Sequence, residues 1–555
     1  MNSLVTLPVA LPLFGAGLAL AMGRNRTAQW IVSVTTLTIV TAIAASMVVV
    51  VDRDGPLLVT LGNWPGDLGI SLVADRFSAL MVLVSTVVSL CVLFYSLGQG
   101  LADGTSATPM TIYHPTYLVL NAGVSNAFLA GDLFNLFVGF EILLIASFVL
   151  LTIGGTGPRM RAGTVYVVVS ILSSMLFLMT IGLVYAATGT VNLALLAARL
   201  DELPDGLSLV LQLLLLVTFS VKAAVFPLSA WLPDSYPTAP APVTAVFAGL
   251  LTKVGIYAIV RTQTLLFPDS PLSTLLMWAA MATMIVGILG AIAQTEIKRI
   301  LSFTLVSHIG YMVFGVALAS PLGLASTIYY VVHHITVQST LFLVAGLIER
   351  RGRSTSLERL GGLARLSPLL AVLYFIPATS LAGIPPFSGF IGKVGLMQAG
   401  VDDGGPLALA LVAAGALTSL LTLYAIGKIW SLAFWRSRGA APPLPVAQAP
   451  REGVDRGDVK SDDGERTTSR TGAESDQGVR WHGGAQVSPA RDVSAAGISM
   501  AVPTAALVGF GLLLTVAAGP LFGYAERSAQ VLQDRDSYIE TMLESAFGSY
   551  EEVDE

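Results

Sequence analysis

The sequence has little charge and almost no cysteine. Only 12% of its 555 residues are Asp, Glu, Lys or Arg, while 54% are hydrophobic, and the mean hydropathy is +0.75. Soluble domains carry about 25% charged residues, so this composition excludes an ordinary soluble protein and is typical of a polytopic helical membrane protein. The single cysteine, Cys91, lies in an apolar run. One cysteine excludes an internal disulfide framework and a thiolate metal cluster.

The motifs of cofactor chemistry are also missing. The sequence contains no nucleotide-binding loop, no haem or iron–sulfur spacing, no nucleophile elbow and no cluster of metal ligands. Its glycine-rich piece Gly154–Pro158 has no phosphate-binding context and is typical of a turn. We therefore expect no cofactor, no bound metal, no nucleic-acid partner and no enzymatic activity in the chain itself.

Long apolar runs make up most of the chain. Taking about 20 residues per membrane span, the sequence predicts an all-α fold with about fourteen transmembrane helices. The first run, Leu4 to Met22, lacks a basic leader and a convincing cleavage site, so we expect a retained helix and not a signal peptide. The predicted helices lie near 3–22, 28–51, 74–97, 114–130, 132–153, 163–187, 208–232, 242–262, 273–293, 297–319, 323–349, 367–400 (interrupted), 405–435 and 497–522.

Charged residues gather in the predicted loops, and the sign of the loops alternates along the chain. Because basic loops stay in the cytoplasm, both termini are expected outside, in the inner (cytoplasmic) membrane of a bacterial cell. Residues 52–73 are expected to form a short external hairpin, with Gly55, Gly62 and Gly69 as turn signals. The basic loops carry Arg24, Arg26, Arg159, Arg161, Lys298, Arg299, Arg350, Arg351, Arg353, Arg359, Arg365, Arg436 and Arg438. The opposite loops carry Asp52, Asp54, Asp67, Asp201, Glu202, Asp205, Asp402 and Asp403.

Two segments are not membrane spans. Ala440 to Val493 is rich in Pro, Gly, Asp, Ser and Arg, with almost no large apolar residues. Such a composition does not bury enough surface to fold, so residues 439–495 are expected to be a disordered cytoplasmic linker. After the last span, Tyr524 to Leu543 has the pattern of an amphipathic helix that leads into an acidic tail.

Two predicted spans contain similar breaks. The sequence FPLSAWL at Phe226–Leu232 resembles PPFSGFI at Pro385–Ile391. An odd number of spans separates them, so the second copy is expected to lie inverted in the membrane, as in transporters with discontinuous helices. A proline removes the hydrogen bond to the carbonyl four residues earlier. Pro227 is therefore expected to free the carbonyl of Ala223, which needs protein or water around it at membrane depth.

Several ionisable residues lie inside the predicted spans. Lys222 and Lys253 flank the first break, Glu141 lies in the middle of its span, and Lys393 follows the second break. A charged lysine near the bilayer centre costs about 2.5–3.5 kcal/mol on insertion scales, so such residues are functional by default. The alternatives are a hydrogen-bonded structural carboxyl for Glu141 and a side chain that snorkels to the interface for Lys393.

Three histidines also lie inside the predicted spans, and three charged residues lie at or near the ends of spans. His308, His333 and His334 lie in consecutive spans; each alone is typical of a hydrogen-bonded core residue, but together with lysines they favour a relay. Asp132 is expected to cap its helix, Lys428 to reach the cytoplasmic face, and Asp234 to be ambiguous.

These residue types suit proton transfer. Lysine has a pKa of about 10.4 in water, and burial lowers the pKa of a lysine by up to about 3–5 units. A carboxylate that approaches such a lysine favours its protonated form, and one that moves away favours release. Histidine exchanges protons near neutrality. The pattern predicts proton handling controlled by Glu141 and Lys222.

With these residues in view, the chain resembles the antiporter-like membrane subunits of respiratory complex I, membrane-bound hydrogenases and Mrp (Mnh) cation/proton antiporters. The resemblance rests on the Glu141 helix, on FSVKAAVFPLSAWLPDSYPTAPAPVTAVFAGLLTKVGIYA, on SHIGYM and on GIPPFSGFIGK. The pieces TKVGIYAIVRTQTLLFP, HHITVQSTLFLVAGLIERR and SLAGIPPFSGFIGK are most similar to the D subunit of the Mrp antiporters.

The resemblance implies a domain order and a relay. Three helices in 1–113 precede two inverted five-helix repeats, 114–264 and 265–438; the linker 439–495 and a final helix with its tail, 496–555, follow. It also implies a partner set: other subunits of a hetero-oligomeric complex in the lipid bilayer. Gln338 stands where some relatives carry a basic residue, and the linker is not part of their common core. The implied relay along the membrane midplane consists of Glu141, Lys222, Lys253, His308, His333, His334 and Lys393.

The resulting hypothesis is a secondary transporter subunit that moves protons inward in exchange for an outward monovalent cation, expected to be Na⁺. The main alternative is a proton-pumping subunit of a redox complex, either an NADH–quinone oxidoreductase or a hydrogenase. A passive proton channel is a third possibility, which the alternation of Glu and Lys disfavours.

Overall fold

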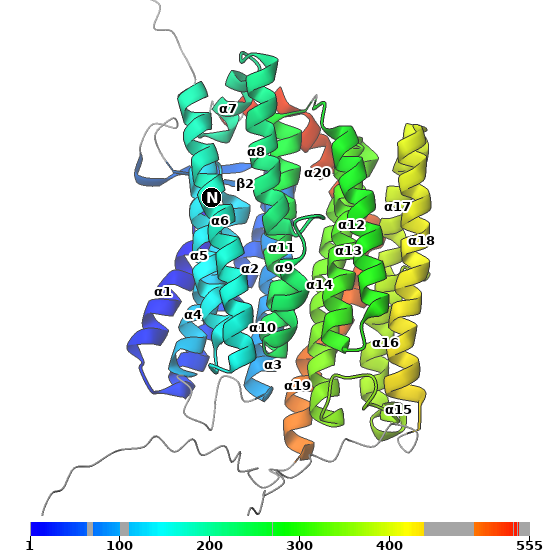
Figure 1. Cartoon of the computed structure of the whole chain (residues 1–555). Helices are drawn as coiled ribbons and strands as arrows, with labels where there is room; N and C mark the ends of the chain where they lie inside the picture. Colours follow the sequence, from blue (N-terminus) through cyan, green and yellow to red (C-terminus); the bar gives the residue numbers. More distant parts are fainter. Residues whose placement is uncertain are drawn as a thin grey trace, which may run out of the picture.

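The chain folds into a bundle of long helices, as the computed structural model shows (Figure 1). The structure describes residues 2–63, 70–99, 110–268, 270–437, 493–536, 538–540 and 542. Among these residues, eleven helices are long and apolar enough to cross a membrane. The all-α, polytopic membrane fold is thereby confirmed. The total of about fourteen spans, based on about 20 residues each, stays a prediction.

The first part of the chain forms three α-helices and a β-hairpin. β1 pairs antiparallel with β2, with Leu57 opposite Ala74 and Thr60 opposite Ser71. This confirms the predicted hairpin, although α2 continues as far as Asp54 and Gly69 lies outside the described residues. The elements are η1 (Asn2–Val5), α1 (Leu7–Ala21), α2 (Arg26–Asp54), β1 (Leu57–Thr60), η2 (Leu61–Asn63), β2 (Ser71–Ala74) and α3 (Arg76–Gln99).

The middle part contains the first broken helix. The predicted span 208–232 is wrong in its extent, because α8 ends at Ala223, and Ala224 has a left-handed φ of 60°. Pro227 therefore lies beyond the helix, and the last carbonyls of α8 accept from Val225 N (3.0 Å) and Trp231 Nε1 (3.2 Å). The elements are η3 (Met110–Ile112), α4 (Tyr113–Leu129), α5 (Leu133–Thr152), α6 (Gly157–Thr188), α7 (Leu193–Leu200), α8 (Asp205–Ala223), α9 (Trp231–Ser235), η4 (Tyr236–Thr238), α10 (Ala241–Val246), the π-helix η5 (Phe247–Leu251), α11 (Thr252–Arg261) and the π-helix η6 (Thr262–Leu266).

The last part contains the second broken helix. The predicted interruption in 367–400 is confirmed, since α16 ends at Ala382, Gly383 has a φ of 82°, and α17 starts at Ser388. Residues 439–492 of the predicted linker lie outside the described residues. The elements are α12 (Ser273–Ala293), α13 (Ile297–Ala317), α14 (Pro321–Gly352), α15 (Leu363–Leu366), α16 (Pro368–Ala382), α17 (Ser388–Asp403), α18 (Pro406–Ile429), the π-helix η7 (Trp430–Trp435), α19 (Val493–Val516) and α20 (Ala518–Gln533).

The predicted basic loops meet at one end of the bundle. There, Lys298 pairs with Glu349 at 2.7 Å and Arg299 pairs with Asp234 at 3.0 Å. The β-hairpin and α20 lie at the opposite end, where Asp52 pairs with Arg76 and Arg527, each at 2.8 Å. The predicted alternation of loops is consistent with these contacts. We call these the basic-loop end and the hairpin end.

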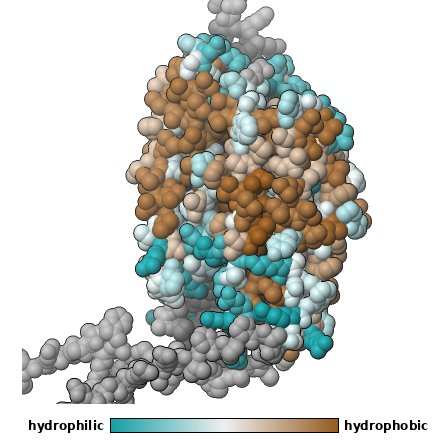
Figure 2. Space-filling view, turned by 45° about the vertical axis from the view of Figure 1, so that its right-hand side comes forward, coloured by the Kyte–Doolittle hydropathy of each residue, from teal (hydrophilic) through white to brown (hydrophobic). Residues whose placement is uncertain are grey.

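The surface and the interior suit a bilayer. Hydrophobic residues gather over the middle of the molecule, with hydrophilic residues toward both ends (Figure 2). The apolar stretches of α14 and of the segment from α10 to η6 are completely buried, whereas the outer helices α2, α6 and α12 expose most of theirs. The central helices are therefore shielded from lipid, and polar groups on them face protein.

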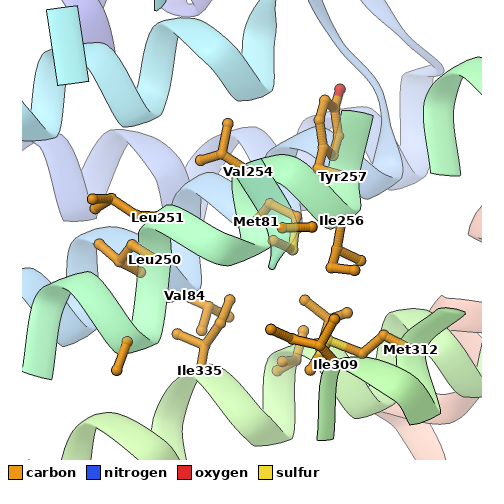
Figure 3. Close-up of a cluster of buried hydrophobic side chains, with 14 of the residues drawn as sticks. Met81, Val84, Leu250, Leu251, Val254, Ile256, Tyr257, Ile309, Met312 and Ile335 are labelled. Carbon is orange, nitrogen blue, oxygen red and sulfur yellow. The ribbon is translucent and has the colours of Figure 1, made fainter. Parts of the chain in front are cut away.

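A buried apolar cluster joins the two halves of the bundle (Figure 3). It brings α11 against α13 and the neighbouring η5 against α14 and α3. Interiors this tightly packed respond to the addition of even one methylene. The labelled members of the cluster are Met81, Val84, Leu250, Leu251, Val254, Ile256, Tyr257, Ile309, Met312 and Ile335.

The contact between α8 and α11 depends on a glycine, and this yields a stability prediction. A Cβ at Gly255 would lie 2.6 Å from the backbone nitrogen of Ala223 and 2.9 Å from its Cα. Because backbone atoms cannot give way cheaply, we expect Gly255→Ala to lower the free energy of unfolding by about 1–3 kcal/mol. Thermal unfolding of the detergent-solubilised protein measures this. Gly182→Ala on α6 is the matched control, because a Cβ there would meet no described atom within 4 Å beyond its own stretch of helix. It should leave the free energy of unfolding unchanged or slightly raised, since alanine is the better helix former; an equal loss from both changes would contradict this packing argument.

Candidate functional site

Glu141 and Lys222 are joined through a serine of a third helix. The hydroxyl of Ser174, on α6, donates to Oε1 of Glu141 on α5. The same hydroxyl accepts from Nζ of Lys222, on α8, at 2.8 Å. Since one hydroxyl both donates and accepts, it provides a continuous hydrogen-bonded connection between an acid and a base. Among the described residues, Glu141 and Lys222 form no direct ion pair, so Ser174 is the bridge.

The surroundings of Lys222 hold its ammonium group in place. Nζ lies 3.4 Å from the carbonyl oxygen of Ser170, one turn before Ser174 on α6. It also lies 5.4 Å from the centre of the Phe140 ring, a cation–π arrangement. The predicted carbonyl of Ala223 plays no part in these contacts, because the lysine turns toward α6 and away from its own break.

Lys253 is completely buried and bonds to its own helix. Its Nζ donates to the carbonyl of Ala248 at 2.6 Å and to the hydroxyl of Thr252 at 3.3 Å. Ala248 belongs to the π-helix η5, where the wider hydrogen-bond register leaves carbonyls available. Within the described part of the chain, no carboxylate pairs with Lys253. Its charge is therefore offset by neutral oxygens alone, or is absent for part of the time.

The three histidines gather around Tyr330. His308 Nδ1 lies 2.6 Å from the hydroxyl of Tyr330, and the rings of His308 and His334 are 5.3 Å apart. Nδ1 of His333 lies 2.9 Å from the hydroxyl of Ser388, the first residue of α17 after the second break. Both ring nitrogens of His334 lack a hydrogen-bond partner in the part of the chain that the structure describes. A buried imidazole without partners is costly unless water or a moving proton reaches it.

Lys393 is buried and does not snorkel. Only 2% of it is exposed, and Nζ donates to the carbonyls of Leu381 and Ala382, each at 3.1 Å. These carbonyls belong to the end of α16, where the break leaves them without helical partners. Nζ also lies 4.8 Å from the centre of the Tyr311 ring. The second break therefore supplies the carbonyls that bind its lysine, whereas Lys222, beside the first break, bonds to α6.

The remaining polar residues have structural roles. Asp132 caps α5, since its carboxylate accepts from the backbone nitrogens of Asn135 (2.6 Å) and Ser71 (3.1 Å). Burial raises the pKa of the Asp132 carboxyl to about 6. Lys428 donates to the carbonyls of Ile292 and Gln294 at the end of α12. In place of a basic residue, Gln338 donates to the carbonyl of Leu301 at 2.7 Å.

Sequence reasoning missed Ser174 and Tyr330, which connect the predicted groups. A signal for Ser174 exists, because Ser170 and Ser174 are four residues apart and so lie on one face of an apolar helix. Tyr330 precedes His333 and His334 by about one helical turn. Among the described residues, no group of three or more His, Cys, Asp or Glu is placed to hold a metal ion.

A charged cavity of about 550 Å³ opens at the basic-loop end. It lies where the first turn of α6, the segment from α9 to α10 and the start of α13 meet the end of α14. Acids and bases both line it, so it suits water and ions and not an apolar ligand. Its charged residues are Arg159, Asp234, Glu296, Lys298, Arg299 and Glu349.

Two family models match this chain. The family model described as NADH:quinone oxidoreductase/Mrp antiporter, TM, matches residues 130–422, which extend from the start of α5 through most of α18. The chain belongs to this family. A second model, NADH-Ubiquinone oxidoreductase (complex I), chain 5 N-terminus, matches residues 63–98. The family predicted from the sequence is thereby confirmed.

Curated relatives and solved structures show which members of the family the chain is similar to. The D subunit of the Na(+)/H(+) antiporter of Alkalihalophilus pseudofirmus is 41% identical over 439 residues, covering 78% of this chain and 87% of the relative. That of Bacillus subtilis is 38% identical, covering 80% and 89%. A chain of the Mrp complex from Dietzia sp. DQ12-45-1b superposes with a TM-score of 0.83 at 34% identity, covering 98% of this chain and 99% of that one. A chain of an archaeal membrane-bound sulfane sulfur reductase has a TM-score of 0.80 at 24% identity, covering 98% and 100%, and shows the shared fold alone.

Proposed function

We propose that the protein is the D subunit of a multisubunit Mrp-type antiporter, which exchanges protons for a monovalent cation, with Na⁺ as the expected cation. The curated relatives named above are D subunits of Na(+)/H(+) antiporters, and the similar chain of known structure belongs to an Mrp complex. On this proposal the chain is part of a transporter and not an enzyme. It works in the bilayer with the other subunits of a hetero-oligomer.

The observation that carries the proposal is the bridge from Glu141 through Ser174 to Lys222. Buried basic groups continue from this bridge through the interior, on helices that pack against one another: Lys253 on α11, the histidines on α13 and α14, and Lys393 on α17. We assign the proton relay to these residues. Neutral hydroxyls and carbonyls hold these basic groups, apart from His334, whose ring nitrogens have no partner among the described residues. A proton is therefore free to arrive and leave without breaking an ion pair.

We further propose that the basic-loop end faces the cytoplasm of a bacterial cell and that the chain lies in its inner membrane. The positive-inside rule supports this orientation. The first helix starts and α20 lies at the hairpin end, so both ends of the chain would be outside. The charged cavity at the basic-loop end would then admit water from the cytoplasm.

A transport assay tests the proposed function. In everted vesicles that contain the whole complex and hold a proton gradient, adding NaCl should release protons, seen as recovery of a pH-sensitive dye, without NADH or another electron donor during the addition. A subunit of a redox complex, the alternative, predicts proton movement that follows electron transfer and ignores Na⁺. Absence of cation-dependent proton release from an assembled complex would refute the proposal.

A further inference from the structure

The start of α17, at the second break, is held by a residue of α19. The first backbone N–H groups of a helix have no partner within the helix, and Phe387, which precedes α17, provides no side-chain cap. The N–H of Ser388 donates instead to Oγ1 of Thr515, on α19, at 3.0 Å. The same hydroxyl donates to the carbonyl of Gly511, one turn earlier on α19, at 3.2 Å. Thr515 therefore supplies, from another helix, the acceptor that a capping residue of α17 would supply.

Ser388 connects this contact to the interior histidines. It is completely buried, and its Oγ lies 2.9 Å from Nδ1 of His333 on α14. The ring of His333 also lies against the next residue of α17, since a Cβ at Gly389 would be 2.8 Å from its Nε2. Two successive residues at the start of α17 thus locate the imidazole. Because hydrogen bonds weaken steeply as their angle departs from linearity, a displacement of this start changes the bond between Ser388 and His333.

The first break has the same kind of contact. The N–H of Phe226, in the break after α8, donates to Oγ1 of Thr283 on α12 at 3.0 Å. The hydroxyl of Thr283 also donates to a carbonyl one turn earlier on its own helix. Phe226 lies four residues after Lys222, and Ser388 lies five residues before Lys393. Each broken helix is thus bound, close to its lysine, by a threonine of a helix beyond its own predicted repeat. This recurrence favours a role at the breaks over incidental packing.

α19 acts on the relay only through the helices that it contacts. It lies outside both predicted repeats and follows the residues 130–422 that the family model matches. It packs against α14, which carries His333, and against α16 and α17, which flank the second break. No group that we assign to the relay lies on α19. The hydrogen bond from Ser388 to Thr515 is a direct connection from this helix to the break.

We propose that Thr515 is a positioning residue of the proton relay, which holds the start of α17 and thereby the hydrogen bond between Ser388 and His333. Its role in proton transfer rests on the proposed function; its hold on α17 does not. The hydroxyl of Thr515 accepts from a backbone amide, which keeps its proton. Thr515 therefore acts through Ser388 and is not itself a proton carrier.

Hydrogen–deuterium exchange of the assembled complex tests the hold on α17. Thr515→Val keeps the shape of the side chain but removes its hydroxyl, so amide exchange at the start of α17 should become about fivefold faster, because one hydrogen bond is lost. Thr515→Ser keeps the hydroxyl and should keep the slow exchange. Thr504→Val is the matched control: Thr504 is buried on α19, and its hydroxyl donates to the carbonyl of Met500 at 2.8 Å but accepts from no described group. Equal exchange at the start of α17 in Thr515→Val and Thr504→Val would overturn the proposal.

Transport by the whole complex tests whether this hold acts through the hydrogen bond between Ser388 and His333. Thr515→Val should slow cation-dependent proton release about fivefold, whereas Thr515→Ser and Thr504→Val should stay active. Ser388→Ala removes the hydroxyl that meets His333 but keeps the backbone N–H. If Thr515 acts through that hydroxyl, Thr515→Val should cause no further loss in a complex that already carries Ser388→Ala. Independent losses that multiply would overturn the positioning role.

The two measurements keep this proposal apart from the proposed function. Faster exchange with unchanged transport would mean that Thr515 holds α17 without a role in the relay, and would overturn the proposal. If the unsubstituted complex exchanges no cation, the proposed function fails, and the role of Thr515 in proton transfer fails with it. Amide exchange would still decide whether Thr515 holds the start of α17.

Discussion

Replacing Lys222 by alanine is expected to abolish cation-coupled proton transport while the complex still assembles. The change removes the amine that donates to Ser174, and so it breaks the hydrogen-bonded bridge between Lys222 and Glu141. It also removes a charge from the interior, which relieves a desolvation cost, so folding need not suffer. Proton release from everted vesicles, with the amount of assembled complex checked by immunoblot, measures both effects. Normal exchange by Lys222→Ala would rule out the relay that starts at Glu141.

Substitution of Ser174 tests the bridge more specifically, because Glu141 and Lys222 both stay in place. Ser174→Ala is expected to slow transport on the order of a hundredfold, the lower range for losing a positioned proton-transfer group. Ser174→Thr keeps the hydroxyl and should retain activity. Ser173→Ala is the matched control, since Ser173 is equally buried on α6 but donates to the carbonyl of Thr218 at 3.2 Å, outside the bridge. If Ser174→Ala and Ser173→Ala behave alike, Glu141 and Lys222 exchange protons without the serine.

The sequence was sufficient to predict the ionisable groups but not the connections between them. A lysine or glutamate in an apolar run stands out by its insertion cost, wherever its partners are. A serine in the same run costs little, because its hydroxyl usually bonds the carbonyl one turn back. Ser174 therefore gave no comparable signal, and its role depends on how α5, α6 and α8 pack. Tyr330 was missed for the same reason, since buried tyrosines are common.

The ends of the helices were predicted from the sequence less well than their existence. Proline signals located both breaks within a few residues, because proline excludes a helical hydrogen bond locally. The ends themselves lie earlier, at Ala223 and Ala382, each followed by a residue with positive φ. The π-helices η5 and η6 were not predicted at all, since a shift in hydrogen-bond register leaves the apolar pattern almost unchanged. Yet η5 supplies the carbonyl that holds Lys253, so this shift matters for the site.

Lys253 is the residue at which a proton carrier and a structural cation are most clearly distinguished. It is completely buried, and among the described residues only the carbonyl of Ala248 and the hydroxyl of Thr252 accept from its Nζ. If Lys253 carries protons, it must be able to lose one. Lys253→Arg keeps the charge but cannot be deprotonated, so we expect an assembled, inactive complex. Lys253→Met, neutral and similar in length, should also be inactive.

Lys253→His completes the test through the pH dependence of transport. Histidine has a reference pKa of about 6.5, against about 10.4 for lysine. An imidazole at this position binds a proton only at lower pH, so activity should be partial, should fall as the pH rises, and should have its optimum below that of the unchanged complex. Transport across a pH series, normalised to assembled complex, measures this. If Lys253 merely balances charge, Lys253→Arg should be active at every pH and Lys253→His active only where imidazole is protonated. An active Lys253→Arg would therefore exclude Lys253 as a carrier, because a guanidinium that never releases its proton cannot pass one on.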